Sequence, residues 1–256
     1  MCGCEDQQVN AEIYDSIGTG YQSVRQPDPR IDAQIRAALG DARSVVNVGA
    51  GVGSYEPETL RTVAVEPSTV MIGQRPQGAA PVIRARAEQL PFGDGAFDAA
   101  MALFTVHHWS DPVVGLQELQ RVSGRQVVLT WDPAFFAEHF WFVRDYLPKG
   151  HQDAGRGTVH LISDALVASV RVEPVPIPAD CTDGFYAAYW ARPEAFLDPT
   201  VRAAISAFAL EDKDVVAHAL ARLSQDLDSG SWERRYGHLR AMNSLDVGYR
   251  LVVANR

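Results

Sequence analysis

A glycine cluster and an acid downstream of it have the types and spacing of a binding site. The glycines, Gly49 to Gly53, directly follow the apolar run Val45–Val48. Glu66 closes the next apolar run, 66 − 49 = 17 residues after the first of these glycines. Glycines let a bound molecule approach the backbone, and an acid at the end of the second strand can bind ribose hydroxyls. The pattern therefore predicts a strand–loop–helix–strand unit that holds a nucleoside cofactor.

Two adjacent histidines, His107 and His108, follow the predicted fourth strand, residues 97–102, and its end, residues 103–105. Open α/β sheets bind ligands outside the carboxyl ends of their strands. A histidine at that place can take a proton from a hydroxyl or an amine during group transfer. The alternative is that the pair bonds to the backbone and holds the turn before Asp111. No further histidine or acid at metal-ligand spacing accompanies the pair, so no metal is expected.

The glycine cluster departs from the dinucleotide fingerprint G-x-G-x-x-G/A at its sixth position, where Ser54 stands. A second phosphate would lie at the start of the next helix, and Glu56 would oppose its charge. A cofactor with a zwitterionic amino-acid tail tolerates this arrangement better. An NAD(P)-dependent oxidoreductase is therefore the less favoured alternative.

Four segments together resemble the class I S-adenosylmethionine-dependent methyltransferases, in particular their type-11 small-molecule branch. They are VVNVGAGVG (45–53), AVEPS (64–68), AEQLPFGDGAFDAA (87–100) and GYRLVVA (248–254). The resemblance implies a Rossmann-like α/β fold, with a seven-stranded, mostly parallel sheet and an antiparallel last strand at its edge. It also implies the cofactor S-adenosyl-L-methionine, which leaves as S-adenosyl-L-homocysteine.

The resemblance also assigns residues to the cofactor. The family usually has an acid where Asn47 stands and often has Asp where Arg86 stands, so the adenine contact is expected from Glu88 or Ala87. The expected cofactor-binding residues are Tyr14, Tyr21, Arg25, Asn47, Gly49, Ala50, Gly51, Gly53, Glu66, Pro67, Met71, Ala87, Glu88, Leu103, Phe104 and Thr105.

Aromatic residues are dense after the fourth and fifth strands and again near residue 190. Such clusters can line a pocket for a flat substrate, although they can equally be the packing face of a helix. The expected substrate-binding residues are Trp109, Trp131, Phe140, Trp141, Tyr186, Tyr189, Trp190 and Arg192. We expect methyl transfer to a ring nitrogen or hydroxyl of a small natural product; the alternative is a non-catalytic protein that binds S-adenosylmethionine.

Residues 179–246 fall outside the minimal fold and carry helical patterns, which predicts a helical insertion that covers the substrate. Residues 1–178 and 247–256 are expected to form the cofactor-binding domain, with an N-terminal helix over 9–26. The net charge of −9 argues against nucleic acid and anionic membrane surfaces as partners. No apolar run is long enough to span a bilayer, and the first residues lack a signal pattern. We expect a cytoplasmic monomer or homodimer.

Overall fold

The computed structural model describes residues 25–147, 158–166 and 169–256. Tyr14, Tyr21 and nearly all of the predicted helix 9–26 lie outside the described residues. Arg25, which was expected at the end of that helix, instead forms an antiparallel bridge with Asp183.

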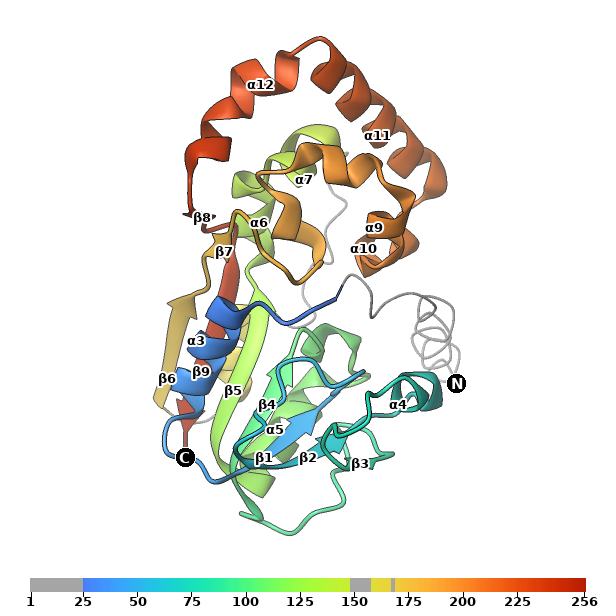
Figure 1. The fold of residues 1–256 in the computed structure, drawn as a ribbon. Coiled ribbons are helices and arrows are strands. Elements are labelled where there is room, and N and C mark those ends of the chain that lie inside the picture. Colours follow the sequence, from blue (N-terminus) through green and yellow to red (C-terminus); the bar gives the residue numbers. More distant parts are fainter. Residues whose placement is uncertain (1–24, 148–157, 167–168) are drawn as a thin grey trace, which may run out of the picture.

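Seven strands form the main sheet, in the order β3-β2-β1-β4-β5-β9-β6 (Figure 1). Their bounds are β1 Ser44–Val48, β2 Arg61–Val65, β3 Val82–Ile83, β4 Phe97–Leu103, β5 Ser123–Trp131, β6 Ser169–Pro174 and β9 Tyr249–Asn255. Only β9 runs antiparallel to its neighbours β5 and β6. The predicted mostly parallel sheet is confirmed, but β9 lies inside the sheet rather than at its edge.

Helices cover both faces of the sheet. All five residues of β1 are buried, as expected of a parallel strand between two helical layers. Because successive side chains point to opposite faces, Val45 packs in the core under α3 (Pro29–Leu39). Val46 packs in the second core, with α5 (Pro112–Val122) and α8 (Val159–Ala165). The short helix α4 (Thr69–Gly73) follows β2.

A helical cap continues from the end of β5 and lies over one end of the sheet (Figure 1). Its neck is the antiparallel pair β7 (Ile177–Pro178) and β8 (Ser244–Leu245), close to the expected ends of the insertion. The cap contains α6 Pro133–His139, α7 Trp141–Tyr146, α9 Pro199–Ala203, α10 Ser206–Leu210, α11 Lys213–Asp228 and α12 Ser231–Tyr236. The cap also contains the 3₁₀ segments Tyr186–Tyr189, Pro193–Leu197 and Gly237–Ala241, whereas the 3₁₀ segment Val106–His108 follows β4. The sequence analysis did not predict that α6 and α7 belong to the cap.

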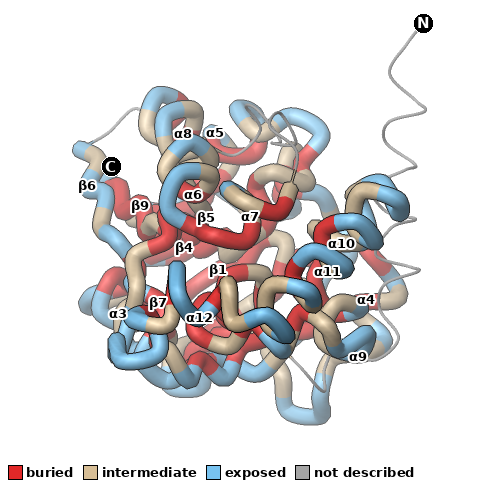
Figure 2. Tube along the Cα trace, turned by 90° about the horizontal axis from the view of Figure 1, so that it is seen from above, coloured by how far each residue is buried: buried red, intermediate tan, exposed pale blue. Residues whose placement is uncertain are grey.

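The aromatic residues of the cap pack in the same core as α3 and Val45. Figure 2 shows buried stretches both in the strands of the sheet and in the cap. Phe140, Trp141 and Trp190 are at most 1% exposed. The indole of Trp141 donates to the carbonyl of Trp190 at 2.8 Å, and that of Trp190 donates to the carbonyl of Ile177 at 2.9 Å. The structure shows these three side chains packed against other residues of the protein, and their contact with substrate stays a prediction. Tyr189 is also buried, with its ring 5.9 Å from that of Phe196.

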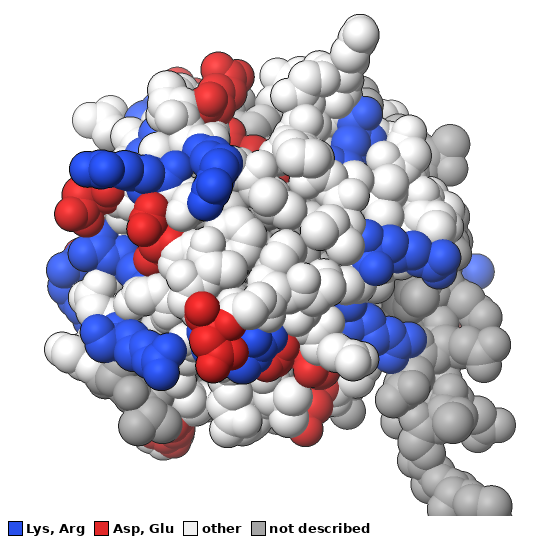
Figure 3. Space-filling view, turned by 90° about the horizontal axis from the view of Figure 1, so that it is seen from below, with Lys and Arg blue, Asp and Glu red and all other residues white. Residues whose placement is uncertain are grey.

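The face below the sheet, opposite the cap, carries basic and acidic side chains interspersed with uncharged ones (Figure 3). None of the helices within the described ranges combines the length and apolar character that a membrane span requires.

Candidate active site

The glycine cluster forms the tight turn after β1. The amides of Gly49 and Ala50 both donate to the carbonyl of Val65, at 2.8 and 3.1 Å. Gly49 has φ +69°, and a Cβ built on it would lie 2.0 Å from the Oγ1 atom of Thr105. Glycine is therefore required here so that the loops after β1 and β4 can touch.

Glu66 joins the glycine turn to the segment after β2. Its Oε2 atom accepts a hydrogen bond from the amide of Gly51 at 2.8 Å, and its Oε1 atom accepts one from the amide of Ser68 at 2.9 Å. The residue is only 7% exposed, and burial raises the pKa of its carboxyl group. Each carboxylate oxygen has a second lone pair that can accept another hydrogen bond. Glu66 can therefore still accept hydrogen bonds from the ribose hydroxyls, as the sequence predicts.

Replacing Glu66 with alanine is expected to weaken S-adenosylmethionine binding by about 1–3 kcal/mol, roughly 5- to 150-fold in Kd. The variant is expected to lose both the ribose contact and the hydrogen bond between Glu66 and the Gly51 amide. Isothermal titration of the variant measures the loss of affinity. Glu173→Ala, on the edge strand β6 and paired with Arg171, is the control. Wild-type affinity in the Glu66 variant would contradict the assignment.

Asn47, Glu56 and Arg75 form a buried polar group behind the glycine turn. An Nη2–Oε2 ion pair of 2.7 Å joins Arg75 to Glu56, with side chains 5% and 9% exposed. Asn47 donates from Nδ2 to Glu56 Oε1 at 3.1 Å, and Arg75 also donates to the carbonyl of Gly51 at 3.2 Å. Because Arg75 compensates Glu56, the sequence argument that Glu56 repels a second phosphate does not hold. No sequence pattern had singled out Arg75.

Met71 and Gly51 lie against each other at this turn. Met71 is buried, and its Cε atom is 3.2 Å from the position that a Gly51 Cβ would take. Of the other residues expected at the cofactor, Ala87 is buried in the second core. Glu88 accepts from the amide of Asp111 at 3.1 Å, and the carbonyl of Pro67 accepts from Arg84 at 3.2 Å.

The histidine pair lies just beyond β4, beside the end of β5. The His107 ring is 3.6 Å from that of His108 and 4.6 Å edge-on from Trp131. Both histidines are half-buried. Burial lowers the pKa of His107 well below its usual value, helped by the neighbouring His108, and burial lowers the pKa of His108 to about 4. Both rings are therefore neutral near pH 7.

The lowered pKa of His108 predicts how stability depends on pH. Below about pH 6.5 the unfolded chain protonates this ring and the folded chain does not, so stability falls as the pH falls from 6.5 towards 4. We expect His108 to contribute about 1–2 kcal/mol to the loss between pH 7 and pH 5. Urea unfolding of wild type and His108→Gln at both pH values isolates this contribution. Equal losses in the two proteins would contradict it.

Aromatic side chains from the cap and from β9 gather around Phe104, which directly follows β4. Phe104, at the end of β4, has its ring 5.3 Å from Phe185 and 5.4 Å from Tyr249. Tyr186 is half-buried, and burial raises the pKa of its hydroxyl well above the usual value. Phe185 and Tyr249 were not foreseen, because their partners come from distant parts of the chain.

Two further predicted substrate residues have structural contacts. Trp109 is buried in the second core, where a Cβ on Gly115 would lie 2.4 Å from its ring. Its substrate contact stays a prediction. Arg192 donates to the carbonyls of Cys181 and Ala188, both at 2.9 Å, and its guanidinium lies 4.9 Å from the Tyr189 ring centre. Its substrate contact stays a prediction.

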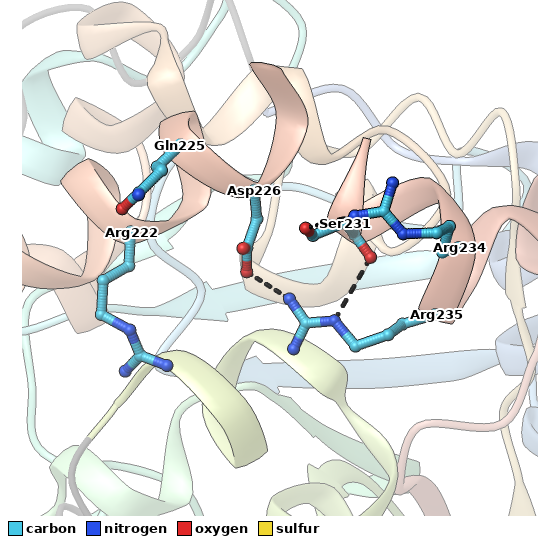
Figure 4. Close-up of a pocket in the computed structure, with 6 residues that line it drawn as sticks. All are labelled: Arg222, Gln225, Asp226, Ser231, Arg234 and Arg235. Atoms are coloured by element: carbon cyan, nitrogen blue, oxygen red, sulfur yellow. Dashed lines mark hydrogen bonds and ion pairs between the residues drawn. The ribbon is translucent and has the colours of Figure 1, made fainter. Parts of the chain in front are cut away.

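A hollow of about 460 Å³ lies on the cap between α11 and α12 (Figure 4). It is lined by Arg222, Gln225, Asp226, Ser231, Arg234 and Arg235. Arg235 is already paired with Asp226. No predicted site residue lines this hollow, so the chemistry is expected at the ends of β1 and β4. Within the described ranges, no three His, Cys, Asp or Glu side chains are grouped to hold a metal.

Comparisons with known proteins decide the family. A profile described as "Methyltransferase domain" matches residues 46–128. A solved putative methyltransferase from an antibiotic biosynthesis pathway of Anabaena variabilis ATCC 29413 is 31% identical. The superposition has a TM-score of 0.77 and covers 91% of this chain and 99% of that one. The chain belongs to the class I S-adenosylmethionine-dependent methyltransferases.

Curated relatives of this methyltransferase act on different acceptors. The tRNA (carboxymethyluridine(34)-5-O)-methyltransferase alkbh8 of Xenopus tropicalis is 29% identical over 67% of this chain and 28% of its own length. The ubiquinone/menaquinone biosynthesis C-methyltransferase UbiE of Geobacter sp. (strain M21) is 30% identical over 44% of this chain and 58% of its own. This chain therefore spans less than two thirds of either relative.

The residues of the site fit the cofactor of the family, S-adenosylmethionine. Gly49, Gly51 and Gly53 each have positive φ, and glycine at these positions lets the chain turn tightly after β1. The carboxylate of Glu66 lies at the end of β2, beside this turn. The alternative of an NAD(P)-dependent oxidoreductase is wrong.

Proposed function

We propose that this methyltransferase transfers a methyl group to a ring nitrogen or hydroxyl oxygen of a small, flat natural product. The observation that carries the proposal is the half-buried, neutral His107 ring between His108 and Trp131, at the carboxyl ends of β4 and β5. The Trp131 ring, edge-on to His107, and the aromatic group around Phe104 at the end of β4 suit a flat acceptor. The antibiotic-pathway relative, similar over 91% of the chain, supports a secondary metabolite.

The reaction is an in-line displacement that depends mainly on positioning. Bound S-adenosylmethionine supplies an electrophilic methyl group on a sulfonium. The acceptor's lone pair forms the new bond to the methyl carbon, and the carbon–sulfur bonding electrons return to sulfur. Holding the two reactants in line can supply roughly 7–11 kcal/mol of the barrier reduction. The loops after β1 and β4, in contact through Gly49 and Thr105, set the relative position of the two sites.

A hydroxyl acceptor must also lose a proton. Neutral His107 is placed to accept it, with His108 packed against the ring. A ring nitrogen with its own lone pair needs no base. The half-buried hydroxyl of Tyr186 stays protonated, since burial raises its pKa, and serves as a hydrogen-bond donor to the acceptor.

The test is a screen of candidate metabolites with S-adenosylmethionine labelled with ¹³C at the methyl group. Mass spectrometry detects the gain of one methyl group, and the ¹³C chemical shift separates N-, O- and C-methyl products. We expect an N- or O-methyl heteroaromatic or phenolic product. A C-methyl product, or labelling of tRNA instead of metabolites, would overturn the proposal. Donor binding without transfer to any of them would favour the non-catalytic alternative.

A further inference from the structure

Two non-glycine residues of the described chain have backbone conformations that side chains rarely adopt. Tyr55 has φ +61° and Phe104 has φ +55°. A bulky residue persists in this region only where its surroundings hold it there. Tyr55 ends the glycine turn after β1, and Phe104 directly follows β4. The two strained residues therefore lie in the two loops that form the floor of the active site.

A carboxylate from the cap holds Tyr55. The tyrosine hydroxyl donates to Asp183 Oδ2 at 2.9 Å and accepts from the amide of Asp28 at 3.2 Å. Arg25 donates from Nε to Asp183 Oδ1 at 2.5 Å. Asp183 is 1% exposed and Tyr55 is 4% exposed, so water does not compete for these bonds. Burial and the adjacent Asp183 raise the pKa of the Tyr55 hydroxyl far above its usual value, which keeps it a donor.

The same turn of the cap also holds Phe104. Phe185 follows Asp183 by two residues, and its amide donates to the Asp183 carbonyl at 3.0 Å. Its ring lies 5.3 Å from that of Phe104 and 5.0 Å edge-on from that of Tyr249. One three-residue turn near the neck of the cap therefore contacts both strained positions.

We propose that the turn Asp183–Phe185 is a clamp that holds the loops after β1 and β4 in their donor-binding conformations. Without the Asp183 contact, Tyr55 relaxes towards negative φ. That rotation moves the glycine turn, including Gly51, whose amide is bound to Glu66. Tyr55 and Asp183 are thus positioning residues, and donor affinity depends on the contact between the turn Asp183–Phe185 and the two loops. By thermodynamic reciprocity, bound donor also stabilises this contact.

The test compares Tyr55→Phe with a matched control, Tyr146→Phe. Tyr146 makes a similar bond, from its hydroxyl to Asp226 Oδ2 at 2.7 Å, beside Arg235, but entirely within the cap. Isothermal titration measures the affinity of each protein for S-adenosyl-L-homocysteine, and thermal unfolding measures stability. Both variants are expected to unfold at lower temperature. Only Tyr55→Phe is expected to bind the ligand more weakly, by about tenfold, while Tyr146→Phe stays within about twofold of wild type.

Equal affinity of Tyr55→Phe and wild type would overturn the clamp, whatever the change in stability. Phe185→Leu is a second test in case Tyr55→Phe does not fold. This substitution keeps an apolar side chain but removes the ring that lies against Phe104. Unchanged ligand affinity in Phe185→Leu would also overturn the clamp. The binding experiment needs no acceptor, so failure of the acceptor screen does not contradict the clamp. A wild-type protein that does not bind S-adenosyl-L-homocysteine would overturn both the clamp and the donor site.

Discussion

Replacing His107 and His108 together with alanine is expected to slow methyl transfer to a hydroxyl acceptor by about 10²–10⁴-fold. The reason is that the variant loses the neutral imidazole at the ends of β4 and β5, beside Trp131. Turnover of the acceptor found in the metabolite screen, under saturating donor, measures the effect. Burial lowers the pKa of His107 well below its usual value and that of His108 to about 4. The wild-type rate should therefore also stay level as the pH falls from 7 to 5.

The control for this experiment is His139→Ala. His139 is exposed on α6, where its ring stacks 3.7 Å from that of Phe135, and its loss should leave turnover unchanged. The affinity for S-adenosyl-L-homocysteine checks that the double variant keeps its donor site. Full turnover in the double variant would reduce the histidine pair to a structural role and favour a ring nitrogen as acceptor.

Gly49→Ala is expected to lower the free energy of unfolding by about 2–4 kcal/mol. Two effects add. Alanine is strained at φ +69°, and its Cβ would lie 2.0 Å from Thr105 Oγ1, with the Thr105 Cβ atom at 2.8 Å. Rotating the Thr105 side chain does not relieve the second contact, so the loops after β1 and β4 must separate. Urea unfolding followed by circular dichroism measures the loss.

Gly73→Ala is the matched control for that substitution. Gly73 ends α4, has ordinary φ, and a Cβ there would meet no atom within 4 Å. Because alanine favours helices over glycine by up to about 1 kcal/mol, this variant should equal or slightly exceed wild type in stability. Similar losses in the two variants would show that the Gly49–Thr105 contact is not what demands glycine.

The sequence predicted the parts of the site that are built from neighbouring residues. The apolar run before Gly49 and the run that ends at Glu66 are short, β-branched and bounded by turns, so their strands could be predicted locally. The sequence placed Glu66 at the end of the second strand, but its bond to the Gly51 amide came only from the structure. The ion pair behind the glycine turn could not be predicted in the same way, because Arg75, which neutralises Glu56, lies on a segment with no recognisable sequence pattern.

Aromatic residues mark the limit of the sequence argument. Phe140, Trp141 and Trp190 occur at the density expected of a pocket wall, yet the structure buries all three in the cap. Phe185 and Tyr249 carried no such pattern and lie against Phe104. On short helices and turns, spacing alone does not determine which side chain meets the core, because the partner comes from another segment.

By itself, the sequence determined the strand–glycine turn–strand unit and the acid at the end of its second strand, and its resemblance to a known family indicated the class of fold and donor. The unit depends on short-range spacing and on backbone conformations that only glycine adopts readily. Only the tertiary structure decided that β9 inserts between β5 and β6, and that Asp183 reaches Tyr55 across 128 residues of chain. Such contacts are selected by the packing of the whole molecule. Burial then turns one carboxylate and one hydroxyl into a fixed link between the cap and the methyl-donor site.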